Sequence, residues 1–313
     1  MARRIRRRQP DFPPLSQSPF VSIIIVTWQT GGRFIESCLN ALHRLEYPDF
    51  ETIIVDNHSN DQTGEVLREL ARNEQLIFNS TNRGFGGGCN DGIRKARGEV
   101  LVFLNVDTEV EPDWLAEIVR PLTENHRAAI TGCKTYYPGG ERIQHAGGVL
   151  FPNGETRHIG YNEKDQGQYD QLREVDFVTG AAIAIRRDFL ELCGGGFDED
   201  FFPAYYEDAD LCYRAKLMGY QVLIAPAARL IHHESPVLEN TGEQYQRLCY
   251  RARMIFCWKN YRLRDWAFEW LPHEAAWIFS RSSKGFRKKQ LRAYLDLLLF
   301  LRGRRLEPDP PGK

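Results

Sequence analysis

Residues 100–107 read VLVFLNVD, and this stretch decides the fold. Five apolar residues, Val100 to Leu104, are typical of a buried strand, and the polar Asn105 and Asp107 follow it. Ligands of open parallel sheets bind where strands end, so a carboxylate here predicts a site for a divalent cation and a diphosphate. A simpler interpretation is that Thr108 to Asp113 form a polar turn and Asp107 caps the next helix. The stretch alone leaves both interpretations open.

The preceding residues alternate between apolar strands and helical patterns. Strands are predicted at residues 20–26, 51–55 and 75–78, with helices between them. Polar residues follow these strands, namely Thr27, Asp56 and Asn82. Repeated strand–helix units with short connections predict an α/β fold: a doubly wound, mostly parallel sheet with helices on both faces. The polar strand ends are then expected to face one crevice.

A glycine-rich segment, NRGFGGGCN, occupies residues 82–90. We expect it to be a loop that opens a helix, where backbone N–H groups can bind phosphate. The spacing is not that of a dinucleotide site. An equally good interpretation is a tight turn that needs positive φ angles.

Two further clusters lie in the second half of the chain, where glycine pairs also predict hairpins. Glu207, Asp208 and Asp210 stand at the start of a predicted helix, and capping accounts for only one or two of the three. A carboxylate beside a sugar hydroxyl is a competent general base. His232 follows a predicted strand, and its imidazole can bind a divalent metal or a diphosphate.

Composition excludes several classes of protein. The chain has 313 residues and a net charge of −1, which gives no reason to expect nucleic acid as a partner. Its seven cysteines include no CxxC pair, which argues against a disulfide framework or a zinc ribbon and for a reducing, cytoplasmic compartment. No apolar run is long enough to predict a transmembrane helix. The arginine-rich start is followed by prolines, which favours a disordered arm over a signal peptide.

These motifs together resemble glycosyltransferase family 2, the inverting enzymes of the GT-A fold. The resemblance covers roughly residues 21–235 and rests on VSIIIVTW, IIVDNHSND, NRGFGGGCN, FLNVDT, DFVTGA, GGFDE and YEDADLCYR, in that order. Within the family the chain looks most like the rhamnosyltransferase-like branch, which builds cell-surface polysaccharides. The resemblance implies a nucleotide-sugar donor, dTDP-rhamnose or a UDP-sugar, and a saccharide or lipid-linked acceptor.

The resemblance also implies roles for single residues. Asp208 would be the catalytic base, and Asp107 with His232 would bind Mg²⁺ or Mn²⁺. The implied substrate-binding residues are Thr27, Asp56, Asn82, Arg83, Gly84, Asn105, Thr179, Gly180 and Glu207. The family's D-x-D pair is Asn105-Val106-Asp107 in this chain, so one of two carboxylates is missing.

Two other functions fit parts of the same pattern. A sugar nucleotidyltransferase would need a glycine-rich, basic loop directly after the first strand, where the chain has Thr27-Trp28-Gln29-Thr30. A non-catalytic protein that binds carbohydrate or nucleotide on a degenerate transferase fold is compatible with Asn105. Asp107, Asp208 and His232 argue against it.

The domain boundaries follow from these observations. We predict a disordered basic arm (1–19), a GT-A catalytic domain (20–236), a helical region (237–306) and a disordered tail (307–313). The catalytic domain divides into a nucleotide-sugar-binding half (20–110) and an acceptor-binding half (111–236). Residues 286–305 combine leucines with arginines, which suits either peripheral contact with the inner face of the cell membrane or packing on the catalytic domain or in a homo-oligomer. We favour packing.

Overall fold

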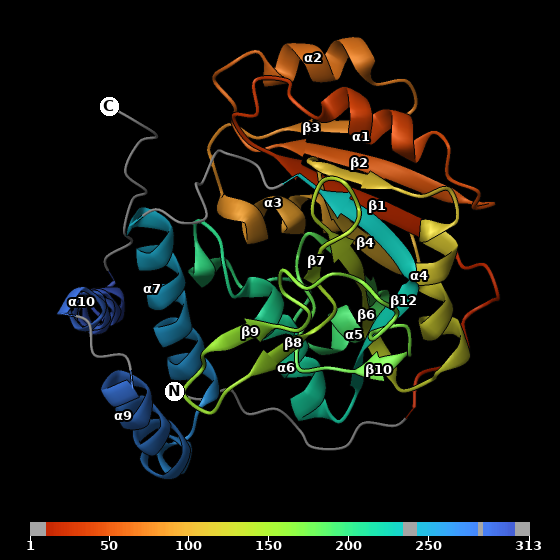
Figure 1. Cartoon of the computed structure of the whole chain (residues 1–313). Helices are drawn as coiled ribbons and strands as arrows, with labels where there is room; N and C mark the ends of the chain where they lie inside the picture. Colours follow the sequence, from red (N-terminus) through yellow and green to blue (C-terminus); the bar gives the residue numbers. More distant parts are fainter. Residues whose placement is uncertain (1–10, 234–242, 281–283, 304–313) are drawn as a thin grey trace.

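The computed structural model describes residues 11–233, 243–280 and 284–303. At its centre lies a ten-stranded sheet with the order β10-β12-β6-β11-β4-β1-β2-β3, with β5 and β7 paired to β12 and β6 (Figure 1). β1 (Val21–Thr27), β2 (Phe50–Asp56), β3 (Gln75–Phe78) and β4 (Val100–Asn105) run parallel. This arrangement confirms the predicted α/β fold with helices flanking a largely parallel sheet.

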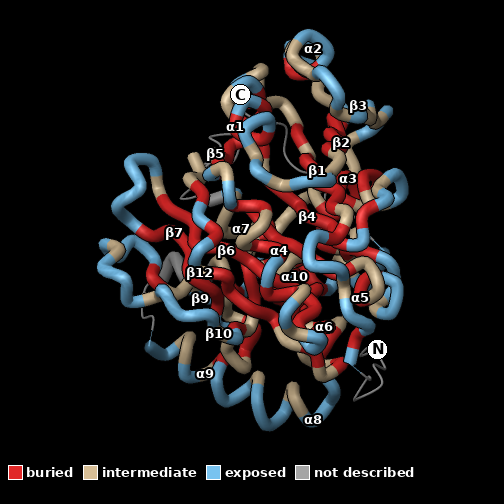
Figure 2. The backbone as a smooth tube through the Cα atoms, turned by 90° about the vertical axis from the view of Figure 1, so that its right-hand side faces the viewer, coloured by how far each residue is buried: buried red, intermediate tan, exposed pale blue. Residues whose placement is uncertain are grey.

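The two faces of the sheet have separate cores. Ile23 and Ile25 of β1 pack with α1 (Ile35–Leu42), α2 (Thr63–Leu70) and α4 (Trp114–Glu124). Ile24, between them, points to the opposite face, where α3 (Gly84–Ile93) and α6 (Glu207–Met218) lie. Side chains of a strand alternate between faces, so the apolar run of β1 serves both cores. Figure 2 shows the sheet as the buried centre of the molecule.

The sequence predicted that the glycines of residues 84–88 form a loop before a helix, and this prediction is wrong. They are the first turns of α3 itself. A Cβ on Gly88 would lie 2.7 Å from Val26 Cγ1, and one on Gly92 would lie 2.4 Å from Ile24 Cγ2. These glycines therefore allow the helix to approach β1 closely. The N–H of Phe85 donates to Pro203 O (2.8 Å), so part of the helix start is already occupied.

Residues 108–113 are also not a simple turn. Thr108–Val110 form strand β5, which pairs antiparallel with the end of β12 (Gln221–His232), so that Thr108 lies opposite His232. Asp113, rather than Asp107, takes the N-cap position of α4. The helix-capping interpretation of Asp107 is therefore wrong. Asp107 lies in the two-residue link between β4 and β5, and the whole of β5 separates it from the start of α4.

The second half of the sheet contains antiparallel strands. β11 (Ala182–Arg186) runs antiparallel between β4 and β6 (Ala128–Tyr136), whereas β6 and β12 are parallel. The remaining elements of this half are β7 (Ile143–His145), β8 (Gly148–Leu150), β9 (Thr156–His158), β10 (Arg173–Glu174), α5 (Arg187–Leu192) and the 3₁₀ turn η1 (Glu199–Phe201). β8 and β9 form a separate hairpin, in agreement with the glycine signals.

A helical extension follows the sheet. It consists of α7 (Glu243–Asn260), α8 (Leu263–Asp265), the π-helical turn η2 (Trp266–Trp270), α9 (Leu271–Ser280) and α10 (Lys284–Leu301). Arg253 of α7 is 1% exposed and binds both carboxylate oxygens of Glu274 of α9 at 2.6 and 2.7 Å. The same guanidinium donates to Gln290 Oε1 of α10 and to the carbonyl of Asn153, in the β8–β9 hairpin. We call these residues the Arg253 brace, because they join three helices to the hairpin.

The residues near both ends of the chain can be compared with the predicted domain boundaries. Phe12 is 5% exposed and stacks on Tyr220 with a centroid separation of 4.0 Å. Phe12 and Pro19 are thus buried and Leu15 packs against the core, whereas the sequence predicted disorder through residue 19. Residues 1–10, 234–242 and 304–313, which include the tail 307–313, lie outside the described residues. Within the described residues, no helix is long and apolar enough to cross a membrane.

Candidate active site

A cavity of about 540 Å³ opens where β4 and β12 end and α6 begins. Seven of the predicted site residues line it: Asn105, Asp107, Thr179, Gly180, Glu207, Asp208 and His232. They come from four separate parts of the chain, so the fold brings together residues that the sequence spreads over more than 120 positions. Among the described residues that line this cavity, none is Lys or Arg.

Asp107 and His232 form a pair on one wall of the cavity. His232 Nε2 lies 3.3 Å from Asp107 Oδ1, and Asn105 Nδ2 lies 3.4 Å from the same ring nitrogen. The pairing of β5 with β12 fixes this geometry, because it sets Thr108 opposite His232. The N–H of His233 donates to the carbonyl of Asp107 (2.8 Å), which fixes the backbone at the carboxylate.

The tautomer of His232 follows from its other ring nitrogen. Nδ1 lies 2.7 Å from Gln144 Oε1 of β7, and a carbonyl oxygen can only accept, so Nδ1 carries the proton. Nε2 then presents its lone pair beside Asp107 and toward the N–H of Asn105. This arrangement suits a divalent cation, since a metal-binding imidazole donates its other N–H to a fixed acceptor.

The set of ligands is small. Within residues 11–233, 243–280 and 284–303 there is no cluster of three or more His, Cys, Asp or Glu residues able to hold a metal. Asp107 and His232 therefore fit a cation of the Mg²⁺ or Mn²⁺ type that takes its remaining ligands from phosphate oxygens and water. They do not fit a cation that needs all of its ligands from protein side chains.

Asp208 lies in the first turn of α6 on another wall. Its Oδ2 accepts from the N–H of Gly180 (2.8 Å), and its Oδ1 accepts from the N–H of Ala209 (2.7 Å). Burial raises the pKa of Asp208, although these backbone hydrogen bonds act in the opposite direction. Gly180, which the family resemblance assigns to substrate, thus positions a carboxylate. A fixed and partly desolvated carboxylate can accept a proton inside the cavity.

The backbone before Asp208 is unusual. Tyr205 and Tyr206 both have left-handed φ angles, 82° and 72°. Such residues cost about 1–3 kcal/mol each and persist only where the surroundings fix them. Tyr206 donates its hydroxyl proton to the carbonyl of Gly154 (2.9 Å) and packs on Phe256 of α7. The extension and the β8–β9 hairpin therefore hold the turn that aims Asp208.

Glu207 is 6% exposed, and its Oε2 has no hydrogen-bond partner in the described part of the chain. Burial, followed by the neighbouring charge of Asp208, raises the pKa of Glu207 to about 8. The folded state thus binds a proton between pH 4.5 and 8 that the unfolded chain releases. This group therefore lowers the free energy of unfolding as pH rises through that range.

We expect the substitution Glu207→Gln to remove this dependence. The amide resembles the neutral acid, so the variant should match the wild type near pH 5 and exceed it by about 2–4 kcal/mol at pH 8, since one pKa unit corresponds to about 1.4 kcal/mol. Urea unfolding at both pH values measures the difference. Glu117→Gln, in a surface pair with Arg120, should change stability by less than about 1 kcal/mol at either pH. A difference for Glu207→Gln that stays constant between pH 5 and 8 would contradict a neutral Glu207.

Five predicted residues do not line this cavity: Thr27, Asp56, Asn82, Arg83 and Gly84. Thr27 and Asp56 are paired across the ends of β1 and β2, and both are buried. The backbone N–H of Asn57 donates to Thr27 O (2.8 Å), so these ends continue the edge on which Asn105 lies. Their predicted role in nucleotide binding stays a prediction.

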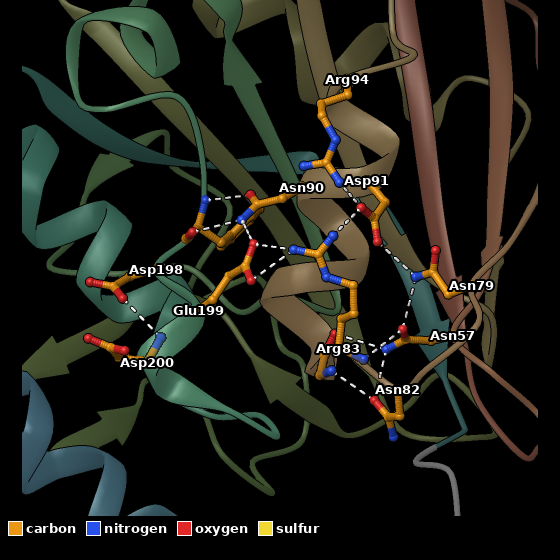
Figure 3. A network of polar contacts seen from close by, with 12 residues as sticks. Asn57, Asn79, Asn82, Arg83, Asn90, Asp91, Arg94, Asp198, Glu199 and Asp200 are labelled. Carbon is orange, nitrogen blue, oxygen red and sulfur yellow. Dashed lines mark hydrogen bonds and ion pairs between the residues drawn. The ribbon is translucent and has the colours of Figure 1, made fainter. Parts of the chain in front are cut away.

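Arg83 belongs to a partly exposed network of polar contacts (Figure 3). Its guanidinium donates to Asp91 Oδ1 at 2.8 Å and to both carboxylate oxygens of Glu199 at 2.9 Å. Asn82 Oδ1 accepts from Asn57 Nδ2 (3.1 Å) and from the N–H of Gly84 (2.8 Å). The network links the start of α3 to η1 and thereby supports the segment that leads to Asp208.

The sequence did not reveal the rest of the cavity lining. It consists of aromatic and neutral side chains from β7, β9, the loops and α7: Gln144, His145, His158, Tyr161, Phe177, Tyr205, Tyr245 and Cys249. His145 Nδ1 lies 2.9 Å from His158 Nδ1, and burial lowers the pKa of both, to about 4 for His158. Both imidazoles are therefore neutral at pH 7. No spacing in the sequence connects these residues, because hairpin and helix packing alone brings them together.

Comparisons with known proteins give a family match and several relatives. Residues 22–193 match the family Glycosyl transferase family 2. An uncharacterized protein, y4gI, of Sinorhizobium fredii is 30% identical over 264 residues, which are 81% of this chain and 29% of that protein. The O-antigen biosynthesis protein RfbC of Myxococcus xanthus is 32% identical over 232 residues, 71% of this chain and 18% of RfbC. The chain thus spans less than a third of the length of either relative.

The fold also matches a solved structure. The mannosyltransferase PcManGT from Pyrobaculum calidifontis, in complex with GDP-Man and Mn²⁺, superposes with a TM-score of 0.57 at 17% identity. The match covers 95% of this chain and 92% of that protein. At this identity the likeness shows a shared fold.

Proposed function

The chain belongs to glycosyl transferase family 2, and on that premise we propose that it transfers a sugar from a nucleoside diphosphate sugar to an acceptor hydroxyl, with inversion. The observation that carries the proposal is the cavity in which Asp208 faces the same space as the Asp107–His232 pair. The acceptor is a saccharide or a lipid-linked saccharide of cell-surface polysaccharide synthesis. The name of RfbC, which refers to O-antigen biosynthesis, supports this class.

The mechanism follows from the two groups that face the cavity, Asp208 and the Asp107–His232 pair. The acceptor oxygen attacks the anomeric carbon while Asp208 accepts the hydroxyl proton. The bond from that carbon to the diphosphate breaks, and its electron pair leaves on the diphosphate oxygen. Attack opposite the leaving group inverts the configuration through a transition state of oxocarbenium character. The Gly180 N–H keeps the carboxylate of Asp208 in place, so little reorganisation is needed when the proton moves.

The leaving diphosphate needs a positive partner, and no described Lys or Arg lines the cavity. A divalent cation held by Asp107 and His232 would neutralise this charge. The Mn²⁺ in the complex of the Pyrobaculum enzyme supports this assignment. The donor is dTDP-rhamnose or a UDP-sugar by resemblance, and the GDP-Man of that complex adds GDP-sugars to the donors worth testing.

Thermal unfolding in the presence of UDP, dTDP, GDP or CDP, each with and without Mn²⁺, tests the proposal. One diphosphate at 100 times its Kd should raise Tm by about 4–8 °C, and only with the metal present, because a ligand of the folded state stabilises it by mass action. The same nucleotide, as its sugar, is then the donor for the transfer assay.

The control separates the metal pair from general effects of charge. Asp107→Asn should remove the metal-dependent shift, whereas Asp113→Asn, an exposed carboxylate six positions later, should retain it. If none of the four diphosphates shifts Tm in the wild type, or if Asp107→Asn responds like the wild type, the proposal is wrong.

A further inference from the structure

Helix α10 has two different faces. The inner face packs on α7: Ala293, Asp296 and Leu297 are at most 9% exposed, and Asp296 pairs with Arg247 of α7. The outer face carries leucines that no described residue covers. Leu291, Leu295, Leu298 and Leu301 are 60%, 52%, 54% and 42% exposed. Their spacing of four, three and three positions places them along one side of the helix.

The sequence of the segment that carries this leucine stripe is strongly basic. Between Lys284 and Arg305 the sequence has eight Lys or Arg residues and one acidic residue, Asp296. The rest of the chain has 33 basic and 41 acidic residues, so this segment differs in sign from the remainder. The one acidic side chain points inward to Arg247, and Arg292, next to Leu291, is exposed.

We infer that the outer face of α10, defined by Leu291, Leu295, Leu298 and Leu301, docks on an anionic lipid surface. A helix with a row of leucines and flanking cations lies in the interface of a bilayer, with the leucines in the acyl region and the cations at the headgroups. Basic residues near an anionic leaflet contribute about 1 kcal/mol each. The inference does not depend on the proposed transfer reaction.

A second copy of the chain fits this face less well. A two-fold contact would place the same patch on both partners and bring the cations of one helix against those of the other. Such like charges oppose association, whereas an anionic bilayer attracts them. Charge complementarity therefore selects the lipid surface over a homodimer.

The position of α10 determines which side of the protein would face the membrane. α10 lies on the outer side of α7, away from the sheet (Figure 1). α7 in turn supplies Tyr245 and Cys249 to the cavity wall. A membrane bound at α10 would therefore lie behind the helix that lines the cavity.

Vesicle flotation tests the inference without nucleotide or donor. The full chain should float with vesicles of phosphatidylcholine containing 30% phosphatidylglycerol and should not float with phosphatidylcholine alone. The triple variant Leu291→Gln/Leu295→Gln/Leu298→Gln should bind the anionic vesicles at least 10-fold more weakly. Leu172→Gln/Leu192→Gln, at two leucines that are each 52% exposed outside the extension, should bind like the wild type.

The remaining outcomes overturn the inference. These are the absence of wild-type binding to anionic vesicles, or a triple variant that binds like the wild type. Light scattering tests for a homodimer. If the wild type is a dimer that does not bind vesicles, and the triple variant is a monomer, the leucine stripe is the contact with a second copy. Circular dichroism confirms that the triple variant is folded, and Arg292→Glu, an exposed substitution next to the stripe, supplies a second test that leaves the leucines in place.

Discussion

Replacing Asp208 with Asn is expected to lower turnover by about 10²–10⁴-fold while nucleoside diphosphate binding stays within about twofold of the wild type. The amide cannot accept the proton of the acceptor hydroxyl. Its carbonyl oxygen can still accept the hydrogen bond from the Gly180 N–H, whereas its NH2 group cannot accept the one that the Ala209 N–H donates to Oδ1. Steady-state transfer with the donor identified by thermal unfolding measures turnover, and the Tm shift with Mn²⁺ and the diphosphate measures binding.

The matched control for this substitution is Asp113→Asn, which makes the same chemical change at an exposed helix start. It should leave turnover within about twofold of the wild type. Near-normal turnover in Asp208→Asn would remove Asp208 from the role of base. Loss of both turnover and diphosphate binding would instead indicate that Asp208 supports the donor site.

The second large effect concerns stability. Glu274→Gln is expected to lower the free energy of unfolding by about 3–5 kcal/mol, because it leaves the buried guanidinium of Arg253 without its counter-charge. The two side chains are 2% and 3% exposed, so water cannot replace the carboxylate. Urea unfolding followed by circular dichroism measures the loss.

An exposed pair provides the comparison. Glu117→Gln removes the partner of Arg120 on the surface of α4 and should cost less than about 1 kcal/mol. A loss of similar size in both variants would show that the Arg253 brace does not contribute as a buried pair. The double variant Arg253→Met/Glu274→Leu should recover much of the stability, since it removes both charges together.

The parts of the fold that depend on local pattern could be predicted from the sequence. The strands predicted at residues 20–26, 51–55 and 100–104 are the parallel strands β1, β2 and β4, and the polar residues after them, Asp107 above all, lie where strands end. Asp208 and His232 were predicted on the family resemblance, and the structure places both in one cavity with Asp107.

The features that the sequence did not predict arise from contacts between distant segments. β5 forms only because it pairs with the end of β12, a partner more than 110 positions later in the chain. The glycines of α3 look like a loop in sequence, and the need for them appears only when Val26 and Ile24 are seen beneath the helix. Gln144 fixes the tautomer of His232 through a single side-chain contact between β7 and β12, which no local pattern encodes.

The Arg253 brace has a consequence for recombining this protein with its relatives. The family match ends at residue 193, before α6, and the β8–β9 hairpin lies inside it, whereas the helices that hold the hairpin lie outside. A crossover between residues 193 and 243 would therefore give a chimera in which Asn153 meets a foreign α7. We expect exchange to preserve the brace when residues 153–290 come from one parent, because Asn153, Arg253, Glu274 and Gln290 then keep their partners.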